Sequence, residues 1–507
     1  MINVSLTDKK FWENEVEGYI FLLKEDLQSI GNNDELKKIE KDFYPNLRNI
    51  LKKHKFTGKF GQSFVLTATR DNSLIQFVFI GMGKLQDKWN IELENLRRAI
   101  GSAVNILKKL DIKNAVINIP DEKIFGLVKP RLVRQIVLIS YIADYEFEKY
   151  KSDKTLSQWK GELILCVKKE DEQVYAQSLK EGKIIGQSTN LARDFSDLPA
   201  NYLTPASLAE QAKKIAVQYG LQYKVFGREK AAEYGMGGFL AVDSGSDEEG
   251  KFVVLEYSCE KKDAPTIALV GKGVTFDSGG ISLKPSAYME GMKFDMSGAA
   301  TVIATMNAIA QLQPKINVVG ITPLVENMPS GKACKQDDII TFMNGKTAEI
   351  KNTDAEGRLI LADALCYAEK FYKPEVILDI ATLTGACLFA LGHFFTGLMT
   401  RDEIVGTKLQ AISLVSGDRV WPLPMDNDFK DAIKSDVADI ANCGAPNYKA
   451  GTITAAWFLS NFVQNAKWAH LDIAGTADSV PGISYFGKGS TGAGVRLFVD
   501  FIMNYTK

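Results

Sequence analysis

Residues 352–359 read NTDAEGRL, and this run places two carboxylates and a guanidinium at alternate positions, Asp354, Glu356 and Arg358. Alternate residues of an extended segment point to the same side. The run lies between a strand-like stretch, TAEIKN, and an amphipathic helix pattern, LILADALCYAEKF. It therefore predicts three charges at a strand-to-helix junction, where active sites of α/β sheets tend to collect. Such charges are costly to bury together, and a bound metal pair would compensate them.

A second charged stretch lies at residues 271–300, GKGVTFDSGGISLKPSAYMEGMKFDMSGAA, and it supplies Lys272, Asp277, Lys284 and Asp295. Its glycines let the backbone run close to whatever the side chains hold, and Pro285 ends local structure. Either stretch alone is compatible with an ordinary surface turn, but the two together favour a metal site.

Six motifs, in this order and spacing, resemble those of the leucyl aminopeptidases, also called cytosol aminopeptidases, a family of two-metal exopeptidases. The motifs are GKGVTFDSGG, KFDMSGAA, ENMPSG, NTDAEGRL, DIATLTGA and HLDIAGTA. The resemblance covers residues 190–507 strongly and residues 1–170 weakly. Two positions in ENMPSGKACKQDD depart from the family pattern, because Cys334 replaces a more common aromatic residue and Asp337 replaces a glycine.

The resemblance implies a role for each matching residue. Lys284 and Arg358 become the catalytic pair, and Asp277 and Glu356 each bridge both ions. The implied metal ligands are Lys272, Asp277, Asp295, Asp354 and Glu356. The implied pocket for the substrate side chain is formed by Met292, Asn352, Ala355, Thr382 and Gly385.

The chemistry of these residue types agrees with the implied roles. Oxygen ligands of this number suit Mn²⁺, Zn²⁺ or Mg²⁺, and two bridging carboxylates hold two ions about 3–4 Å apart. A lysine ligand must be neutral, so nearby dications and burial are expected to lower the pKa of Lys272. By resemblance, Lys284 stays protonated and stabilises the oxyanion of the scissile carbonyl. Arg358 is expected to hold a bicarbonate ion that relays a proton to the leaving amine.

Other hydrolase classes fit the sequence less well. Only three histidines occur, His54, His393 and His470, with neither an HExxH motif nor a GxSxG elbow. We expect His470 to have a structural hydrogen-bonding role, His393 to pack in a loop and His54 to be solvated. A two-metal phosphoesterase would usually recruit several histidines and no lysine ligand. A catalytically inactive scaffold or nucleic-acid-binding relative would be expected to have lost ligands, yet all are present.

Composition predicts a soluble globular protein of two or more domains, because the 507 residues are 46% hydrophobic and carry a net charge of −1. No basic field indicates nucleic acid or an anionic membrane. The first residues, MINVSLTDKKFWENEVEG, resemble neither a secretory signal nor a transit peptide, and GACLFALGHFFTGLM is too short to span a bilayer. We therefore expect a cytoplasmic protein. Six cysteines without CxxC spacing are expected to be reduced.

Strand-like runs alternate with helical ones, which predicts an α/β fold of two domains. We expect a smaller N-terminal α/β domain over residues 1–170, a connecting helix over 171–193 and a larger catalytic domain over 194–507. The first domain is predicted to contain the strands QFVFIGMG, NAVINIP and GELILCV. The second is predicted to have a central, mostly parallel sheet flanked by helices, with the site residues at strand ends.

The resemblance also implies the biological setting. The expected activity is release of N-terminal amino acids, with leucine and other medium apolar residues favoured, from short peptides during intracellular turnover. The expected assembly is a homohexamer, a dimer of trimers, whose active sites face a shared interior cavity that excludes folded proteins.

Overall fold

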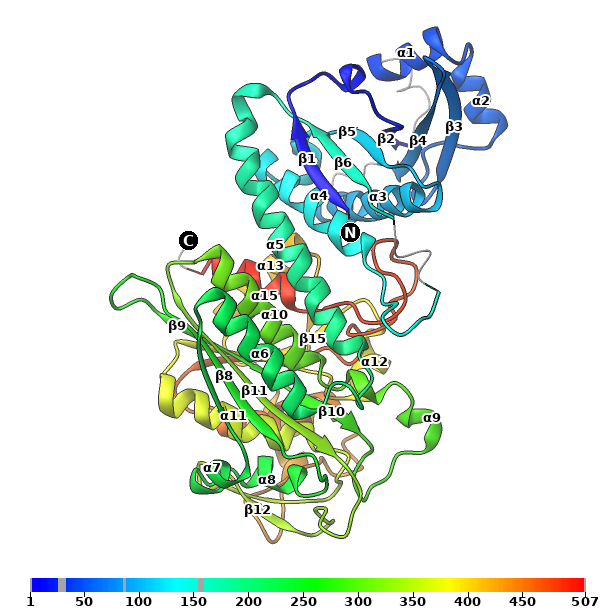
Figure 1. Ribbon diagram of the computed structural model, residues 1–507. Helices are drawn as coiled ribbons and strands as arrows, with labels where there is room; N and C mark the ends of the chain where they lie inside the picture. The colour runs from blue at the N-terminus through cyan, green and yellow to red at the C-terminus, as the bar shows by residue number, and fades with distance from the viewer. Residues whose placement is uncertain (1, 26–32, 85–87, 154–158, 506–507) are drawn as a thin grey trace. The chain divides into compact units, whose positions relative to one another are not determined.

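The computed structural model describes residues 2–25, 33–84, 88–153 and 159–505. The chain divides into two compact units, each with its own sheet (Figure 1). Unit 1 comprises Met1–Gln187 with Gly482–Gly487, and unit 2 comprises Ser188–Pro481 with Lys488–Lys507. No helix in the described ranges is both long enough and apolar enough to cross a membrane.

Unit 1 is built on a six-stranded sheet in the order β1-β6-β5-β2-β4-β3, in which only the β3–β4 pair is antiparallel. Its strands are β1 (Asn3–Thr7), β2 (Gly18–Lys24), β3 (Ser63–Arg70), β4 (Ser73–Gly83), β5 (Asn114–Asn118) and β6 (Glu162–Cys166). Its helices are η1 (Phe11–Glu13), α1 (Asp34–Asp42), α2 (Leu47–Lys53), α3 (Trp89–Lys109), η3 (Glu122–Phe125), α4 (Lys129–Asp144) and η5 (Lys169–Asp171). The 26-residue helix α5 (Glu172–Asp197) contributes residues to both units.

Helices cover both faces of this sheet. Leu36 of α1 and Leu51 of α2 pack in one aromatic-rich core with Phe21 and Phe77 of the strands, while α3 packs against β4 and β2 and also against α4. The side chain of Asn33 caps α1 by accepting a hydrogen bond from the backbone N–H of Leu36. The sequence patterns predicted β4, β5 and β6 but not the other three strands. The edge strands β1 and β3 are largely half-exposed, and the short apolar run of β2 has no period that separates a strand from a helix.

Unit 2 is built on a nine-stranded sheet in the order β16-β15-β18-β14-β9-β11-β8-β7, with β10 also paired to β11. Its strands are β7 (Gln222–Phe226), β8 (Lys251–Tyr257), β9 (Thr266–Gly271), β10 (Gly273–Asp277), β11 (Asn317–Asn327), β14 (Val376–Ala381), β15 (Thr396–Thr400), β16 (Val420–Pro422) and β18 (Lys467–Asp472). The central pairs are parallel, and the antiparallel pairs involve β7, β8 and β15. A small sheet contains β12 (Ile339–Thr341), β13 (Thr347–Glu349) and β17 (Ile440–Ala441). The predicted α/β fold with a mostly parallel central sheet is confirmed.

Helices flank the sheet of unit 2 on both faces (Figure 1). The helices are α6 (Pro205–Tyr219), α7 (Arg228–Glu233), α8 (Gly237–Asp243), α9 (Ser286–Met289), η6 (Met292–Phe294), α10 (Ser297–Leu312), α11 (Gly357–Tyr372), α12 (Gly385–Leu391), α13 (Glu403–Ser416), η7 (Asn427–Ile433), α14 (Gly451–Leu459), η8 (Ser460–Phe462) and α15 (Val495–Met503). Gly320 of β11 faces Val302 and Met306 of α10, whereas its neighbour Ile321 packs in one core with α11 and α14. Alternate residues of β11 therefore pack against helices on opposite faces of the sheet.

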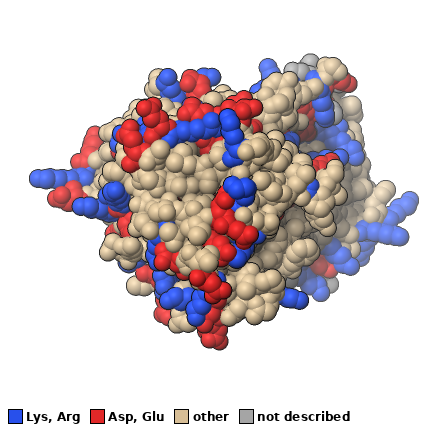
Figure 2. Space-filling model, turned by 90° about the horizontal axis from the view of Figure 1, so that it is seen from below, with Lys and Arg blue, Asp and Glu red and all other residues tan. Residues whose placement is uncertain are grey.

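The parallel register brings several chain turns to one edge of this sheet. β9, β10, β11, β14 and β18 run parallel to one another, so their carboxyl ends meet there. Lys272 follows β9, Asp277 ends β10 and Thr382 follows β14. Figure 2 shows acidic and basic side chains interspersed over the face that it draws.

Candidate metal and active site

The carboxyl edge of the sheet gathers the charged residues that the sequence singled out. One oxygen from each of Asp277, Asp354 and Glu356 lies within 4.8 Å of the others. The ammonium nitrogen of Lys272 lies 2.8 Å from Asp295 Oδ2 and 2.8 Å from Glu356 Oε1. These five side chains therefore form one cluster, although they come from four separate segments of the chain.

Lys284 lies on the same cluster. Its Nζ is 2.8 Å from Asp277 Oδ2, and it also donates a hydrogen bond to Asp354 Oδ1. The side chain of Lys284 is less buried than that of Lys272. The ammonium of Lys284 thus occupies the more open side of the cluster.

The loop after β10 needs glycine to reach this arrangement. Gly279 has a φ of +88°, and a Cβ there would lie 2.4 Å from the carbonyl oxygen of Ser282 and 2.8 Å from Asp354 Oδ1. Asp277 Oδ1 accepts hydrogen bonds from Gly279 N at 2.9 Å and from Asn327 Nδ2 at 2.8 Å. The backbone N–H of Gly279 and the side-chain amide of Asn327 therefore fix the orientation of the Asp277 carboxylate.

The loop before α11 is joined to the loop after β10 through Thr353. The Thr353 hydroxyl donates to the carbonyl of Gly279 at 2.7 Å and accepts from Ser282 N at 2.8 Å. Asn327 Nδ2 also donates to the carbonyl of Thr353 at 3.1 Å. The two motif loops are consequently held as one rigid unit.

The Lys272 side chain is closely packed by α11 and hydrogen-bonded to the loop after β14. A Cβ at Gly357 would lie 2.5 Å from Lys272 Cε, so the first residue of α11 must be small. Lys272 Nζ donates to the carbonyl of Thr382 at 3.0 Å, and the Thr382 hydroxyl donates to Asp295 Oδ1 at 2.7 Å. Thr382 thus links the lysine and one carboxylate of the cluster.

The residues of this cluster fit divalent cations. Asp277, Asp295, Asp354 and Glu356 supply four carboxylates, against the ammonium groups of Lys272 and Lys284. Within the described part of the chain, Lys272 Nζ lies 2.8 Å from the buried Asp295 Oδ2 and from Glu356 Oε1, whereas the buried Glu356 Oε2 has no hydrogen-bond partner. Buried carboxylate oxygens without donors are costly, and dications compensate them. Several carboxylate oxygens with one amine form a donor set suited to Mn²⁺ or Zn²⁺.

Burial and mutual repulsion change the protonation of these acids. Burial raises the pKa of Asp295, Asp354 and Glu356, and the charge of Asp277 raises each of them further. Each of these acids is thus harder to ionise than a free carboxyl, which adjacent dications would reverse.

In both lysines of the cluster, nearby carboxylates raise the pKa more than burial lowers it. Burial would lower the pKa of Lys272, but Asp295, Glu356 and Asp277 outweigh it and raise the pKa above the usual range. The lowering expected from the sequence therefore needs the positive charge of bound dications. Burial likewise opposes a charged Lys284, but Asp277 and Asp354 raise its pKa, which favours a protonated ammonium.

Arg358 projects from the first turn of α11 and is buried. Its Nη1 donates to the carbonyl of Asn442 at 2.7 Å. Its Nε is buried and has no hydrogen-bond partner among the described residues. An unsatisfied guanidinium N–H beside the cluster is suited to an anion with planar geometry.

The residues of the implied side-chain pocket flank the cluster in the chain. Asn352 Oδ1 accepts a hydrogen bond from Asp354 N at 2.9 Å, and Ala355 is buried between Asp354 and Glu356. Met292 begins η6, shortly before Asp295, and Gly385 begins α12 after Thr382. An added Cβ at Gly385 would meet no atom within 4 Å.

The three histidines lie outside the cluster of charges. His470 Nδ1 is 2.5 Å from Asp379 Oδ1, and Trp468 Nε1 donates to the other oxygen of that carboxylate at 2.6 Å. This buried contact is the structural hydrogen-bonding role expected of His470. His393 Nδ1 lies 3.0 Å from the carbonyl of Gly475, and His54 packs against the ring of Phe64.

Smaller expectations can also be compared with the structure. All six cysteines have free thiols. Asp337, which stands where the family pattern has glycine, adopts a φ of +65°. This left-handed conformation explains why glycine is common there, and aspartate is among the residues that tolerate it.

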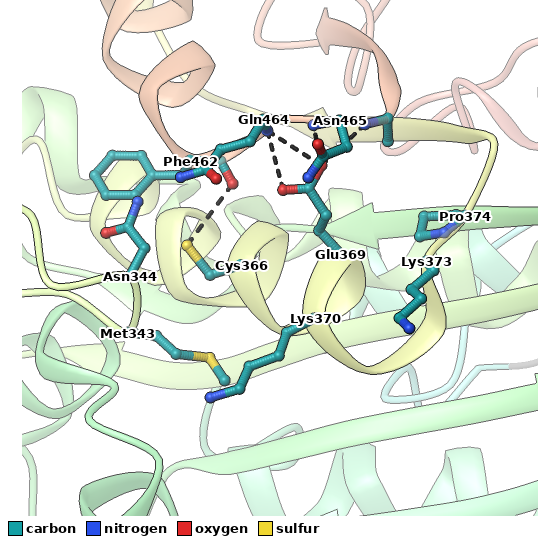
Figure 3. Close-up of a pocket in the computed structure, with 11 residues that line it drawn as sticks. Met343, Asn344, Cys366, Glu369, Lys370, Lys373, Pro374, Phe462, Gln464 and Asn465 are labelled. Atoms are coloured by element: carbon teal, nitrogen blue, oxygen red, sulfur yellow. Dashed lines mark hydrogen bonds between the residues drawn. The ribbon is translucent and has the colours of Figure 1, made fainter.

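A separate cavity of about 470 Å³ lies beside the second half of α11 (Figure 3). Glu369 lines this cavity, and its carboxylate accepts hydrogen bonds from the backbone N–H groups of Gln464, Asn465 and Ala466. Three converging N–H groups could bind an anion, but here the protein's own carboxylate satisfies them. None of the charged cluster residues described above lines this cavity.

The sequence patterns did not identify Asn327 or Asn442 as site residues. Asn327 is the last residue of β11 and bonds Asp277, while Asn442 follows β17 and bonds Arg358. An isolated asparagine near a turn carries no metal-site signal of its own, because turns commonly contain asparagine. Their roles become visible only once distant segments are brought together.

Comparisons with known proteins agree with this geometry. Residues 190–499 match the catalytic domain of the cytosol aminopeptidase family, and residues 20–154 match its N-terminal domain. A cytosol aminopeptidase of Pseudomonas aeruginosa is 42% identical over 461 residues, which cover 90% of this chain and 91% of that protein. A probable cytosol aminopeptidase of Alkaliphilus oremlandii is 39% identical over 481 residues, 94% of each chain.

Two solved structures are similar over most of their length. A mutant of tomato leucine aminopeptidase superposes with a TM-score of 0.88 at 30% identity, covering 99% of this chain and 96% of that one. The bottromycin maturation enzyme BotP, in complex with Mn, gives a TM-score of 0.81 at 31% identity, covering 90% and 96%. With both domains matched and the charged cluster at the expected edge of the sheet, the chain belongs to the cytosol aminopeptidase family.

Proposed function

We propose that this metal-dependent aminopeptidase releases N-terminal residues from short peptides at a centre of two divalent ions. The class of activity follows from the family. The proposed ligands are Lys272, Asp277, Asp295, Asp354 and Glu356. The observation that carries the proposal is the buried excess of four carboxylates over two lysines, in which Glu356 Oε2 has no hydrogen-bond partner within the described residues.

We assign Asp277 and Glu356 as the ligands that bridge both ions. Glu356 Oε2 is buried without a hydrogen-bond partner within the described residues, and Oε1 is contacted at 2.8 Å by Lys272, itself a proposed ligand, so both oxygens would be available to ions held here. Asp277 lies within reach of both Asp354 and Glu356, which supports the same assignment. Bound divalent ions supply Lewis-acid polarisation of a carbonyl and a nucleophile at neutral pH. Mn²⁺ and Zn²⁺ are the first candidates, with Mg²⁺ as a third, and BotP contains Mn.

Lys284 and Arg358 are proposed as the catalytic residues. The ammonium of Lys284, on the more open side of the cluster, is positioned to donate to the oxygen of the scissile carbonyl as negative charge develops. Arg358 is proposed to hold a bicarbonate ion that moves a proton toward the leaving amine. The buried Nε without a partner in the described chain supports this role.

The proposed side-chain pocket accounts for a preference for medium apolar residues such as leucine. Met292 is half-buried, Ala355 is small, and the space above Gly385 is open. Such a lining discriminates weakly, by about 1–3 kcal/mol per methylene group. A profile over N-terminal residues would test it, and equal rates for glycine, leucine and aspartate would contradict it.

We also propose a cytoplasmic homohexamer, a dimer of trimers. Large apolar side chains exposed on unit 2, among them Tyr288, Phe389 and Trp421, support burial by other subunits. Light scattering should then give a mass near six times the 56.0 kDa chain. A fully active monomer would contradict the assembly.

The activity itself can be tested with paired substrates. With added Mn²⁺, the full chain should release an amide-linked chromophore from an N-terminal leucine derivative and leave a phosphate ester intact. Metal analysis of the same preparation should find two ions per chain. Cleavage of only the phosphate ester would instead support a two-metal phosphoesterase.

A further inference from the structure

Asn442 holds the loop that carries two of the proposed ligands. It follows β17 and is fully buried. Its Oδ1 accepts hydrogen bonds from Lys351 N at 2.8 Å and Asn352 N at 3.3 Å. Its Nδ2 donates to the carbonyls of Asn352 at 2.7 Å and Ala355 at 3.4 Å. One amide thus satisfies four backbone groups on either side of Asp354.

The backbone of Asn442 is equally engaged. Its N–H donates to the carbonyl of Glu349 at 2.9 Å, which continues the parallel pairing of β13 with β17 by one residue. Its carbonyl accepts the hydrogen bond from Arg358 Nη1 at 2.7 Å. Beyond the end of the strand, the side chain therefore takes over the role of a pairing strand, and the carbonyl orients the guanidinium.

We propose that Asn442 is a positioning residue for this centre. It sets the direction of Asp354 and Glu356 through the loop backbone, and it sets the direction of Arg358 through its own carbonyl. This inference rests on the proposed metal and anion roles of those three residues. Partners that orient metal ligands typically contribute about 10–100-fold to metal affinity or activity.

The amide chemistry explains why asparagine is required. The loop presents two N–H donors and two carbonyl acceptors to one buried side chain, and only an amide offers both kinds of atom at that length. Aspartate has the same shape and keeps the two acceptor bonds, but it cannot donate to the carbonyls of Asn352 and Ala355. It also adds negative charge near the cluster.

Asn317 supplies a matched control. It lies at the opposite end of β11 from Asn327, and its amide also bridges backbone groups. Its Oδ1 accepts from Cys259 N at 3.0 Å, and its Nδ2 donates to the carbonyl of Ala264 at 3.3 Å. Substitution there removes two amide-to-backbone hydrogen bonds of the same kind without touching the cluster.

The test compares Asn442→Ala, Asn442→Asp, Asn317→Ala and Asn317→Asp in the full chain. Calorimetric titration with Mn²⁺ alone, the thermal midpoint, kcat and KM would be measured for each. We expect both Asn442 variants to bind Mn²⁺ about 10–100-fold more weakly and to lose kcat more than KM. Weaker binding in Asn442→Asp would be decisive, because the added negative charge alone would strengthen attraction for a cation. The Asn317 variants should lose thermal stability without losing Mn²⁺ affinity.

Two results would overturn the positioning role. The first is Mn²⁺ affinity and kcat within twofold of wild type in either Asn442 variant. The second is an equal loss of affinity in the Asn317 variants, since that would reflect general destabilisation. Failure of wild type itself to bind Mn²⁺ would instead overturn the proposed metal site, so the two failures are distinguishable. If Asn442→Ala does not fold, the isosteric Asn442→Asp variant decides.

Discussion

Unit 2 buries two very different groups of charges, the charged cluster of the candidate site and the ion pair between Asp418 and Arg496. In the pair, Asp418 Oδ1 accepts from Arg496 Nε at 3.0 Å and Nη2 at 2.5 Å. Asp418 Oδ2 accepts from the backbone N–H groups of Gly494 and Leu497 at 3.2 Å each. Both oxygens of this carboxylate are satisfied, and one cation balances one anion.

The cluster has neither property. Four carboxylates face two lysines, and Glu356, only 1% exposed, has Lys272 Nζ 2.8 Å from Oε1 but no hydrogen-bond partner for Oε2 within the described residues. Burial of charge is therefore common to both regions, and the excess of carboxylates over cations distinguishes the candidate site. Substitutions in the two regions should therefore have different consequences for metal binding and for stability.

Replacing Glu356 with alanine should have the largest effect, because a bridging ligand serves both ions. We expect kcat to fall by about 10³-fold or more, together with the number of Mn²⁺ ions bound per chain, as measured by metal analysis. Glu369→Ala, on the distal half of the same helix, is the control and should retain both ions. Two bound ions and near-normal turnover in Glu356→Ala would show that the bridging assignment is wrong.

Breaking the ion pair between Asp418 and Arg496 should lower the stability of the protein and leave its Mn²⁺ affinity unchanged. Arg496→Met leaves the Asp418 charge buried without its cation, and we expect a loss of about 3–5 kcal/mol in the free energy of unfolding. Denaturant unfolding measures this loss. The double variant Asp418→Leu with Arg496→Met should recover part of it. A change in Mn²⁺ affinity without a change in stability would contradict the comparison.

Lys284→Ala should separate catalysis from metal binding. Removing one preorganised donor typically lowers kcat by about 10²–10³-fold, equivalent to about 3–4 kcal/mol. The variant should still bind Mn²⁺, because Lys284 is not a proposed ligand. A rise in KM alone would indicate that Lys284 positions substrate.

Mn²⁺ should stabilise the protein by compensating the excess carboxylates. At a free concentration of 100 times Kd, the expected gain in the free energy of unfolding is about 2.7 kcal/mol per site. Thermal melts with and without chelator measure the shift. An equal shift in Glu356→Ala would locate the binding elsewhere.

The buried pair of His470 with Asp379 should add a modest pH dependence. Burial alone would lower the pKa of His470, but Asp379 outweighs it and raises the pKa above its ordinary value of 6.5. A raised folded-state pKa contributes stability fully below pH 6.5, and this contribution is lost as pH rises through the folded-state pKa. One group changes the slope by at most about 1.4 kcal/mol per pH unit. The slope should be absent in His470→Gln, and a wild-type slope of opposite sign would contradict the pairing.

Much of unit 2 could be predicted from local patterns. The strands that end at the site are nearly continuous apolar runs, such as TIALVG and, apart from Asp379, VILDIA, which is typical of parallel strands buried on both faces. The glycines of GKGVTFDSGG predicted close backbone approach, and Gly279 provides it. The residue roles and the hexamer stay predictions that follow from the resemblance, and the domain boundaries and the cytoplasmic location stay predictions from the sequence pattern.

Unit 1 was harder to predict, and its final composition includes a segment from the far end of the chain. Residues Gly482–Gly487 belong to this unit, where Asn105 donates to the carbonyl of Ser484 and Tyr485 bonds Glu94. No periodicity marks such a segment, because its contacts join residues several hundred positions apart.

The chemistry of the candidate site could be inferred from local sequence, because carboxylates, lysines and glycines at set spacings are local properties of the chain. How those groups are held together became visible in the folded chain. The amides of Asn327 and Asn442 reach backbone and carboxylate groups up to 91 positions away. Hydrogen bonds over such separations depend on how strands and loops meet in space, and local periodicity carries no record of that.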